Sequence, residues 1–180
     1  VLADRLSADG KANVLLLEAG PTDKKQEAHI PAAFSKLFKT PLDWDYETEP
    51  QEHAAGRQLY WPRGKLLGGS SSMNAMIYQR GNAADYNRWA SLGNPGWSYR
   101  EVLPYFKGLE NYYSGESEYH GGDGALYVNK LRSPNPLSKA FVRACKQAGL
   151  PLTDDFNGAK QEGFGLYQVT QKGGQRHSAA

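Results

Sequence analysis

An α/β fold is predicted for this chain of 180 residues, and three stretches of its sequence predict it. Residues 1–9 carry apolar side chains four positions apart, which is typical of the end of an amphipathic helix, and Gly10 is suited to stop that helix. Residues 14–17 form a short, wholly apolar run between turn residues, which is typical of a buried parallel strand. Asn135 followed by Pro136 predicts another helix, because asparagine caps helices and proline suits the first helical position.

The remaining elements are predicted from capping residues and turn signals. Asn82 with Asp85 predicts a helix over 83–91, and Ser98 with Glu101 predicts another that runs to about residue 110. Pro104 lies inside the second of these helices and predicts a kink. The other expected segments are an irregular region over 21–62 with a short helix near 31–38, a loop over 111–123, a strand over 125–131, a helix from 136 that ends before Gly149, and a strand over 165–169.

The composition is that of an ordinary soluble globular protein, with 39% hydrophobic and 22% charged residues. The net charge is +2 and the basic residues are dispersed, so we predict no nucleic-acid partner. No apolar run approaches the roughly 20 residues that span a bilayer. The single cysteine, Cys145, allows no intrachain disulfide and fits a reducing compartment. We therefore expect a cytoplasmic protein that associates with a membrane only peripherally, and the absence of an initiator methionine predicts that the natural N-terminus lies upstream.

Glu18 directly follows the apolar run at 14–17. Helix, short turn, buried strand and acidic residue is the order found in the second half of a βαβ dinucleotide-binding unit. A carboxylate at that strand tip accepts hydrogen bonds from ribose hydroxyls, although an exposed glutamate at a strand end is the alternative interpretation. The glycine-rich turn that accompanies such a site would lie about 20 residues upstream, before Val1.

A glycine- and serine-rich segment over residues 61–82, WPRGKLLGGSSSMNAMIYQRGN, is the more specific feature. Gly68 and Gly69 allow the main chain to approach a flat or anionic ligand closely. Ser70 offers a hydroxyl and an N–H group, and Asn74 offers both a donor and an acceptor. A flexible linker is the alternative interpretation, but the apolar residues that follow without interruption argue against it.

This segment resembles the signature of the GMC (glucose–methanol–choline) oxidoreductase family. The positions that match the signature are Gly64, Lys65, Leu67, Gly68, Gly69, Ser70, Ser71, Met73, Asn74, Tyr78, Gly81 and Asn87. Residues 1–7 resemble the segment after the family's glycine-rich turn, and residues 17–20 resemble its second strand. The stretches that resemble its bacterial alcohol and choline dehydrogenase branch are 85–86, Trp89, 94–97, 103–106, 155–158, 161–163 and 176–180. The resemblance covers nearly the whole chain.

The resemblance implies a Rossmann-like FAD-binding domain with insertions, incomplete at both ends. The partial domain would span residues 1–180, without its first strand and GxGxxG turn, and elements of an α+β substrate domain would begin within 83–135. The residues with an implied role in holding FAD are Glu18 and Ala19 at the adenosine ribose, Arg63 and Gly64 shaping the loop, Gly68, Gly69 and Ser70 along the pyrophosphate and ribityl chain, and Asn74, Ala75 and Met76 at the flavin ring. Met73 stands where some relatives carry a histidine linked to FAD, so non-covalent binding is expected. A sheet without its central strand exposes apolar edges, so we expect the 180 residues alone neither to fold stably nor to turn over substrate.

The implied activity is the FAD-dependent oxidation of a primary alcohol, of the choline or aliphatic type, to an aldehyde by hydride transfer to flavin N5. The electron acceptor would be oxygen or a quinone-like carrier. The family's catalytic histidine and its partner would lie downstream of these residues, and no metal is implied. Two alternatives stay open: an FAD-containing hydroxynitrile lyase and a non-catalytic flavin-binding remnant.

Several residues are expected to have structural roles only. The chain's histidines, His29, His53, His120 and His177, are expected to be surface or loop residues. The tryptophans, Trp44, Trp61, Trp89 and Trp97, are expected to be packing anchors. Cys145 lies on the apolar face of its predicted helix and is expected to be buried.

Overall fold

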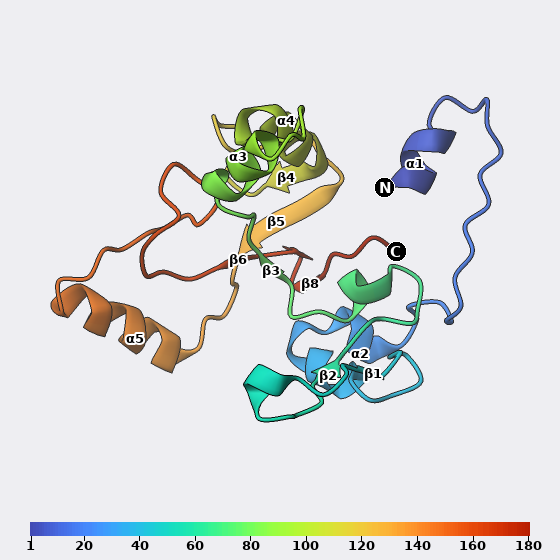
Figure 1. The fold of residues 1–180 in the computed structure, drawn as a ribbon, viewed down its shortest axis with the longest axis horizontal. Helices are drawn as coiled ribbons and strands as arrows, with labels where there is room; N and C mark the ends of the chain where they lie inside the picture. Colours follow the sequence, from blue (N-terminus) through green and yellow to red (C-terminus); the bar gives the residue numbers. More distant parts are fainter. The chain divides into compact units, whose positions relative to one another are not determined.

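A computed structural model describes all 180 residues, and the chain divides into two compact units (Figure 1). The first unit comprises residues 1–75 and 175–180, and the second comprises residues 76–174. Both units combine short helices with short strands, which confirms the predicted α/β class. No helix has the length and apolar character needed to cross a bilayer.

The first unit is built from short elements joined by long irregular connections. Its elements are α1 (Leu2–Ser7), α2 (Gln26–His29), the 3₁₀ helix η1 (Pro31–Leu37), β1 (Tyr46–Glu47), the 3₁₀ helix η2 (Glu52–Ala54), β2 (Tyr60–Trp61), the 3₁₀ helix η3 (Gly69–Ser72) and β8 (Gln175–Arg176). Strands β1 and β2 pair antiparallel, with Tyr46 opposite Trp61. The helix expected near 31–38 is present as η1, directly after α2.

At the start of the chain, the structure agrees with the prediction from the sequence only in part. Helix α1 forms as predicted, and Gly10 follows it in the left-handed region at φ +67. Residues 14–17 do not form the predicted buried strand, and Leu15 and Leu17 are each 82% exposed. That prediction is wrong for this structure, because a strand needs a neighbour to satisfy its backbone groups and no segment of the chain pairs with this run.

A small apolar core holds the first unit together. Its buried members are Ala28, Leu37, Leu42, Leu66 and Met73, with Phe38 packed against them. Within the glycine- and serine-rich segment, Leu66 and Met73 flank residues 67–72, and both are almost inaccessible to solvent. The stretch between them is therefore anchored at both ends by burial of apolar side chains.

The second unit contains a mixed sheet of four strands in the order β3-β6-β5-β4. Its elements are β3 (Ile77–Tyr78), α3 (Ala83–Ser91), α4 (Tyr99–Leu109), β4 (Glu110–Tyr112), β5 (Leu126–Lys130), α5 (Pro136–Gln147), β6 (Gln168–Val169) and β7 (Gln171–Lys172). Strands β4 and β5 pair parallel, and the other neighbours pair antiparallel. The predicted strands over 125–131 and 165–169 are present as β5 and the shorter β6.

The caps that predicted the helices of the second unit are present. The Asn82 side chain accepts a hydrogen bond from Ala84 N at 2.9 Å, and Asn82 N donates to Asp85 at 3.0 Å. Ser98 N likewise donates to Glu101 at 3.0 Å. Helix α5 begins at the Asn135 cap as predicted. Helix α4 continues through Pro104.

Other features of the second unit differ from what the sequence predicted. The expected loop over 111–123 begins inside β4, whose pairing with β5 depends on contacts far apart in the sequence. On α5, Cys145 is buried as expected, but Leu137 and Phe141 are 78% and 61% exposed. The helix stands away from the sheet in Figure 1. Phe141 meets the Phe164 ring edge to face, with ring centroids 6.1 Å apart.

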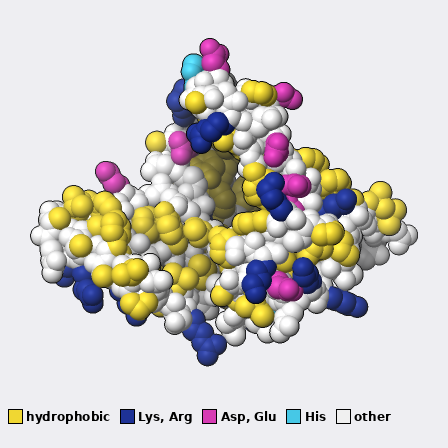
Figure 2. Space-filling view, turned by 90° about the horizontal axis from the view of Figure 1, so that it is seen from below, with side chains coloured by type: hydrophobic (Ala, Val, Ile, Leu, Met, Phe, Trp, Pro, Cys, Tyr) yellow, Lys and Arg dark blue, Asp and Glu magenta, His cyan; other side chains and the backbone are white.

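All four tryptophans, which were expected to be packing anchors, are partly exposed. They contact other aromatic rings instead of a core: Trp44 stacks on Tyr46 with ring centroids 5.8 Å apart, and Trp89 meets Trp97 edge to face at 5.6 Å. On the face drawn in Figure 2, hydrophobic side chains gather in several separate patches.

Candidate cofactor-binding site

The two predicted motifs meet in the first unit. Leu67 N donates a hydrogen bond to the carbonyl oxygen of Pro21 at 2.9 Å. Next to it, Gly20 lies so close to Lys65 that a Cβ at position 20 would overlap the Lys65 carbonyl. The segment that follows Glu18 thus packs directly, backbone on backbone, against the segment that leads into the Gly68–Gly69 turn.

The turn itself depends on glycine. Gly68 and Gly69 both adopt left-handed conformations, with φ of +84 and +56, which residues with a Cβ seldom adopt. The hydroxyls of Ser71 and Ser72 stabilise the turn by donating to the carbonyl oxygens of Gly68 and Leu67, at 2.6 and 2.8 Å. Open space lies beside Gly69, where an added Cβ would meet nothing within 4 Å.

Gly64 is packed beside this turn, and Arg63 directly precedes Gly64 in the sequence. A Cβ at position 64 would overlap the Gly69 carbonyl, and Gly64 N donates to the Ser70 hydroxyl at 3.1 Å. The Arg63 guanidinium donates to the Pro62 carbonyl and lies 5.7 Å from the centre of the Trp61 ring. The exposed guanidinium leaves its remaining donors open to a ligand.

Buried and exposed side chains are interspersed along the two motifs. Leu66, Ser72 and Met73 are buried, and Met73 is only 2% exposed. The predicted FAD-binding residues with exposed side chains are Glu18, Ala19, Arg63, Ser70, Asn74 and Ala75. The loop therefore anchors its apolar side chains in the core and leaves several polar side chains exposed.

Met76 is the one predicted site residue that lies in the second unit. It is buried, and its φ of +61 is rare for a residue with a side chain. Its carbonyl oxygen accepts a hydrogen bond from Thr170 N at 2.9 Å, which holds this conformation.

Asp43 supports the loop through a hydrogen bond to Arg63, and no sequence motif identified it. Its carboxylate accepts hydrogen bonds from Arg63 N at 3.0 Å and from the Tyr60 hydroxyl. Burial alone would raise the pKa of Asp43, but the bonds from Tyr60 and from the N–H groups of Lys39, Asp45 and Arg63 outweigh burial and lower that pKa to about 2. Burial and the bond to Asp43 also raise the pKa of Tyr60 to about 12.

Replacing Asp43 with asparagine should destabilise this unit by roughly 2 kcal/mol at pH 7, because the amide nitrogen cannot accept the bonds that one carboxylate oxygen accepts. The depressed pKa gives the sign of the pH effect: the stabilisation is complete above the unfolded pKa of about 3.9 and disappears as the pH falls through about 2. Urea unfolding of the two proteins at pH 7 measures the difference. Equal unfolding midpoints would contradict the assigned role of Asp43.

Arg176 is a second residue that the motif analysis did not single out, beyond the family resemblance of residues 176–180. Its Nε donates to the Ala28 carbonyl at 2.7 Å. Its Nη1 donates to the Ser71 carbonyl at 3.0 Å and to the Asn74 side-chain oxygen at 2.9 Å. A residue far along the chain therefore fixes the side chain of Asn74.

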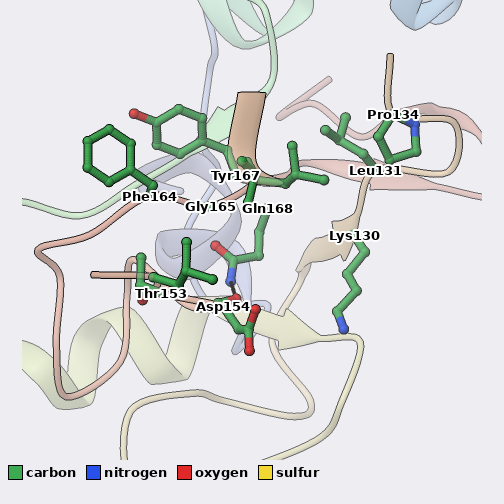
Figure 3. A pocket seen from close by; sticks show the side chains of 12 residues that line it. Lys130, Leu131, Pro134, Thr153, Asp154, Phe164, Gly165, Tyr167 and Gln168 are labelled. Atoms are coloured by element: carbon green, nitrogen blue, oxygen red, sulfur yellow. Dashed lines mark hydrogen bonds between the residues drawn. The ribbon is translucent and has the colours of Figure 1, made fainter. Parts of the chain in front are cut away.

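The second unit contains a separate cavity of about 270 Å³ (Figure 3). Its lining includes Lys130, Leu131, Pro134, Phe164 and Tyr167. In Figure 3 the Gln168 side chain points toward Asp154, where its amide nitrogen lies 3.5 Å from the backbone oxygen. None of the predicted FAD-binding residues lines this cavity, so it is not part of the candidate site.

His120 lies in a loop, as expected, but it is buried and not on the surface. It is 3% exposed, and its ring lies between Glu110, at 3.0 Å from Nδ1, and Asp155, at 2.8 Å from Nε2. Arg80 completes the cluster with an ion pair of 2.8 Å to Glu110, and the His120 ring stacks on Tyr112. Residues near His120 in sequence are typical of a loop, whereas these partners come from distant segments.

The charge of His120 follows from its partners. Burial would lower its pKa, but hydrogen bonds to Asp155 and Glu110 and their negative charges outweigh burial and raise the pKa to about 9. The same contact with His120 holds the pKa of Asp155 below its usual value, against the effect of burial. The cluster thus pairs the cations of Arg80 and His120 with the carboxylates of Glu110 and Asp155 at neutral pH.

Stability should fall with rising pH because of His120. Its folded pKa, about 9, lies above the unfolded value of about 6.5, so its contribution is complete below pH 6.5 and is lost as the pH rises through 9. The loss amounts to roughly 3 kcal/mol at most, at 1.36 kcal/mol per pKa unit. Urea unfolding between pH 6 and 10 should show this decline in the natural protein and a flatter profile in His120→Gln. Parallel profiles would rule out the assigned pKa.

The chain is similar to known proteins along nearly its whole length. A family profile described as GMC oxidoreductase matches residues 12–180. The chain is 50% identical to an alcohol dehydrogenase [acceptor] from Pseudomonas putida and 49% identical to an oxygen-dependent choline dehydrogenase from Rhizobium etli. These matches cover 100% and 99% of this chain but 33% of each relative. The chain therefore spans about a third of the length of the relatives that it matches.

Solved structures agree with this assignment. The pyridoxine 4-oxidase from Mesorbium loti superposes with a TM-score of 0.92 at 37% identity, over 99% of this chain and 35% of that one. An FAD-dependent oxidoreductase from Chaetomium thermophilum superposes with a TM-score of 0.84 at 31% identity, over 99% of this chain and 33% of that one. The chain belongs to the GMC oxidoreductase family, which confirms the resemblance inferred from its signature. Members of this family bind FAD and act on CH–OH donors.

Proposed function

We propose that these 180 residues form part of the FAD-binding domain of an enzyme that oxidises a primary alcohol to an aldehyde, of the choline or aliphatic type. The observation that carries the proposal is the backbone contact between Gly20–Pro21 and Lys65–Leu67, which joins the ribose-binding segment to the Gly68–Gly69 loop. Similarity over the whole chain to alcohol and choline dehydrogenases supports the substrate class.

The residues present fit FAD. The left-handed turn at Gly68 and Gly69, with open space beside Gly69, leaves room for a pyrophosphate to approach the backbone. The exposed Glu18 carboxylate is an acceptor for ribose hydroxyls. Asn74, Ala75 and Met76 are proposed to approach the flavin ring. When bound, FAD supplies the chemistry by accepting a hydride at N5.

The chain's own residues bind and orient, and we propose no catalytic base among them. His120 is held in an ion cluster, and the remaining histidines are exposed or partly exposed. The base is proposed to lie outside these residues, as are most groups that contact the alcohol. Elements of a substrate domain are proposed within 83–135. Oxygen or a quinone-like carrier is the proposed electron acceptor. The proposed location is the cytoplasm or the inner face of the cell membrane.

FAD is proposed to be held without a covalent bond. Met73 occupies the position of the linking histidine in some relatives, and its side chain is packed in the core of the first unit. Acid precipitation of the full-length protein should therefore release all of its flavin into the supernatant. Flavin that stays with the precipitated protein would contradict this assignment.

The activity is tested by the visible spectrum of the full-length protein, recorded without oxygen before and after primary alcohols are added. The expected result is a flavin band that bleaches with one class of primary alcohol. A flavin band that no alcohol bleaches would contradict alcohol oxidation and favour a lyase or a non-catalytic flavoprotein. A folded protein with no flavin band, even after FAD is supplied, would contradict the cofactor assignment itself.

A further inference from the structure

Arg176 carries a buried charge to which the proposed function assigns no role. Its side chain is 7% exposed, and the salt bridges of the chain include none to Arg176. Nε and Nη1 are satisfied by Ala28, Ser71 and Asn74, but Nη2 is buried and has no hydrogen-bond partner. It is the only buried side-chain nitrogen or oxygen without such a partner in the chain.

Such an arrangement is unfavourable unless something compensates it. A buried guanidinium with one unpaired nitrogen and no counterion loses hydration that its hydrogen bonds only partly replace. Burial lowers the pKa of Arg176 to about 10, and no neighbouring acid opposes that effect. Arginine forms its strongest pairs with carboxylates and phosphates, through parallel N–H donors. The Arg176 guanidinium is therefore suited to pair with an anion.

The position of the guanidinium indicates which anion it would take. Nη1 bonds two residues of the loop, the Ser71 carbonyl and the Asn74 side chain, and Ala179 N donates to the Ser71 hydroxyl at 3.0 Å. Residues 176–179 thus pack against the loop that starts at Gly68. The proposed function places the FAD pyrophosphate at this loop, and a pyrophosphate carries negative charge.

We infer that Arg176 is a further FAD-binding residue, which donates from Nη2 to a pyrophosphate oxygen while its Nη1 positions Asn74. The inference rests on the proposed function, because it takes FAD as the ligand of the loop. It adds a residue from a distant strand, β8, to a site that the sequence motifs confine to residues 18–19 and 63–76.

The test compares Arg176→Gln with Arg88→Gln in the full-length protein, since Arg88 is an exposed arginine on α3. Titration of FAD into apoprotein, followed by flavin fluorescence, gives Kd. Arg176→Gln should raise Kd at least about tenfold, the change that corresponds to 1.4 kcal/mol. The Tm of the apoprotein should fall little, because loss of an uncompensated charge offsets the lost hydrogen bonds. Added salt should weaken FAD binding by the natural protein more than by the variant. Arg88→Gln should change none of these values.

Other outcomes would overturn the inference. An unchanged Kd, or a fall in apoprotein Tm with the FAD-induced Tm shift preserved, would mean that Arg176 is structural only or pairs with an acid elsewhere in the protein. If Arg176→Gln does not fold, Arg176→Lys provides the test: it keeps the charge, so it should retain part of the affinity and its salt dependence. Salt-independent binding by Arg176→Lys would exclude the pyrophosphate contact. Failure of the natural protein to bind FAD would instead contradict the proposed function, before any variant is considered.

Discussion

Replacement of Gly20 with alanine should strongly weaken FAD binding. The added Cβ would overlap the backbone carbonyl of Lys65, which cannot move aside as a flexible side chain could. The segment carrying Glu18 would have to separate from Lys65–Leu67, and the Pro21–Leu67 hydrogen bond would break. We expect FAD affinity to fall by at least about 100-fold, equivalent to about 2.8 kcal/mol, in a fluorescence titration of the full-length apoprotein.

Gly108→Ala is the matched control. Gly108 lies in helix α4, and an added Cβ there would meet nothing within 4 Å. Alanine favours a helix over glycine by about 1 kcal/mol, so this variant should be slightly more stable and bind FAD normally. Normal FAD binding by Gly20→Ala would show that contact between the two motifs is not needed for the site.

Replacement of Glu110 with alanine should have the largest effect on stability. Glu110 is fully buried, and it bonds the Arg80 guanidinium, the His120 ring and Gly121 N. Removal of its carboxylate would leave the buried Arg80 guanidinium without its ion-pair partner and His120 with Asp155 alone. Breaking a buried ion pair by removing one partner costs about 3–5 kcal/mol, which is a large part of the stability of an ordinary domain. Thermal or urea unfolding should show this loss in the second unit.

Glu116→Ala separates the effect of burial from the effect of charge. Glu116 also pairs with a cation, at 3.4 Å from Lys107 Nζ, but its side chain is exposed. Exposed ion pairs contribute about 0–1 kcal/mol, so this variant should unfold almost as the natural protein does. If Glu110→Ala cost no more than Glu116→Ala, the buried cluster would not be the stabilising feature described above.

The sequence predicted best those features that depend on neighbouring residues. The caps at Asn82, Ser98 and Asn135 start helices as expected, because capping needs only residues two or three positions apart. The glycine-rich loop was predicted for the same reason, since φ near Gly68 depends on the residue itself. Family resemblance assigned the loop to FAD, which local chemistry alone could not do.

The features that the sequence missed depend on distant partners. His120 does lie in a loop, but its burial depends on Glu110 and Asp155, and the sequence does not show which carboxylates approach it. Asp43 and Arg176 were missed for the same reason. The apolar run at 14–17 was predicted as a strand from its composition, but a strand also needs a partner, and the chain provides none.

Hydrogen exchange of the full-length protein with and without FAD tests the central claim, that the segments around residues 18–21 and 63–75 form one FAD site. The account predicts that FAD slows amide exchange in both segments together, while helix α5, with its exposed Leu137 and Phe141, is unaffected. Bound FAD that protects neither segment, or only one of them, would contradict it.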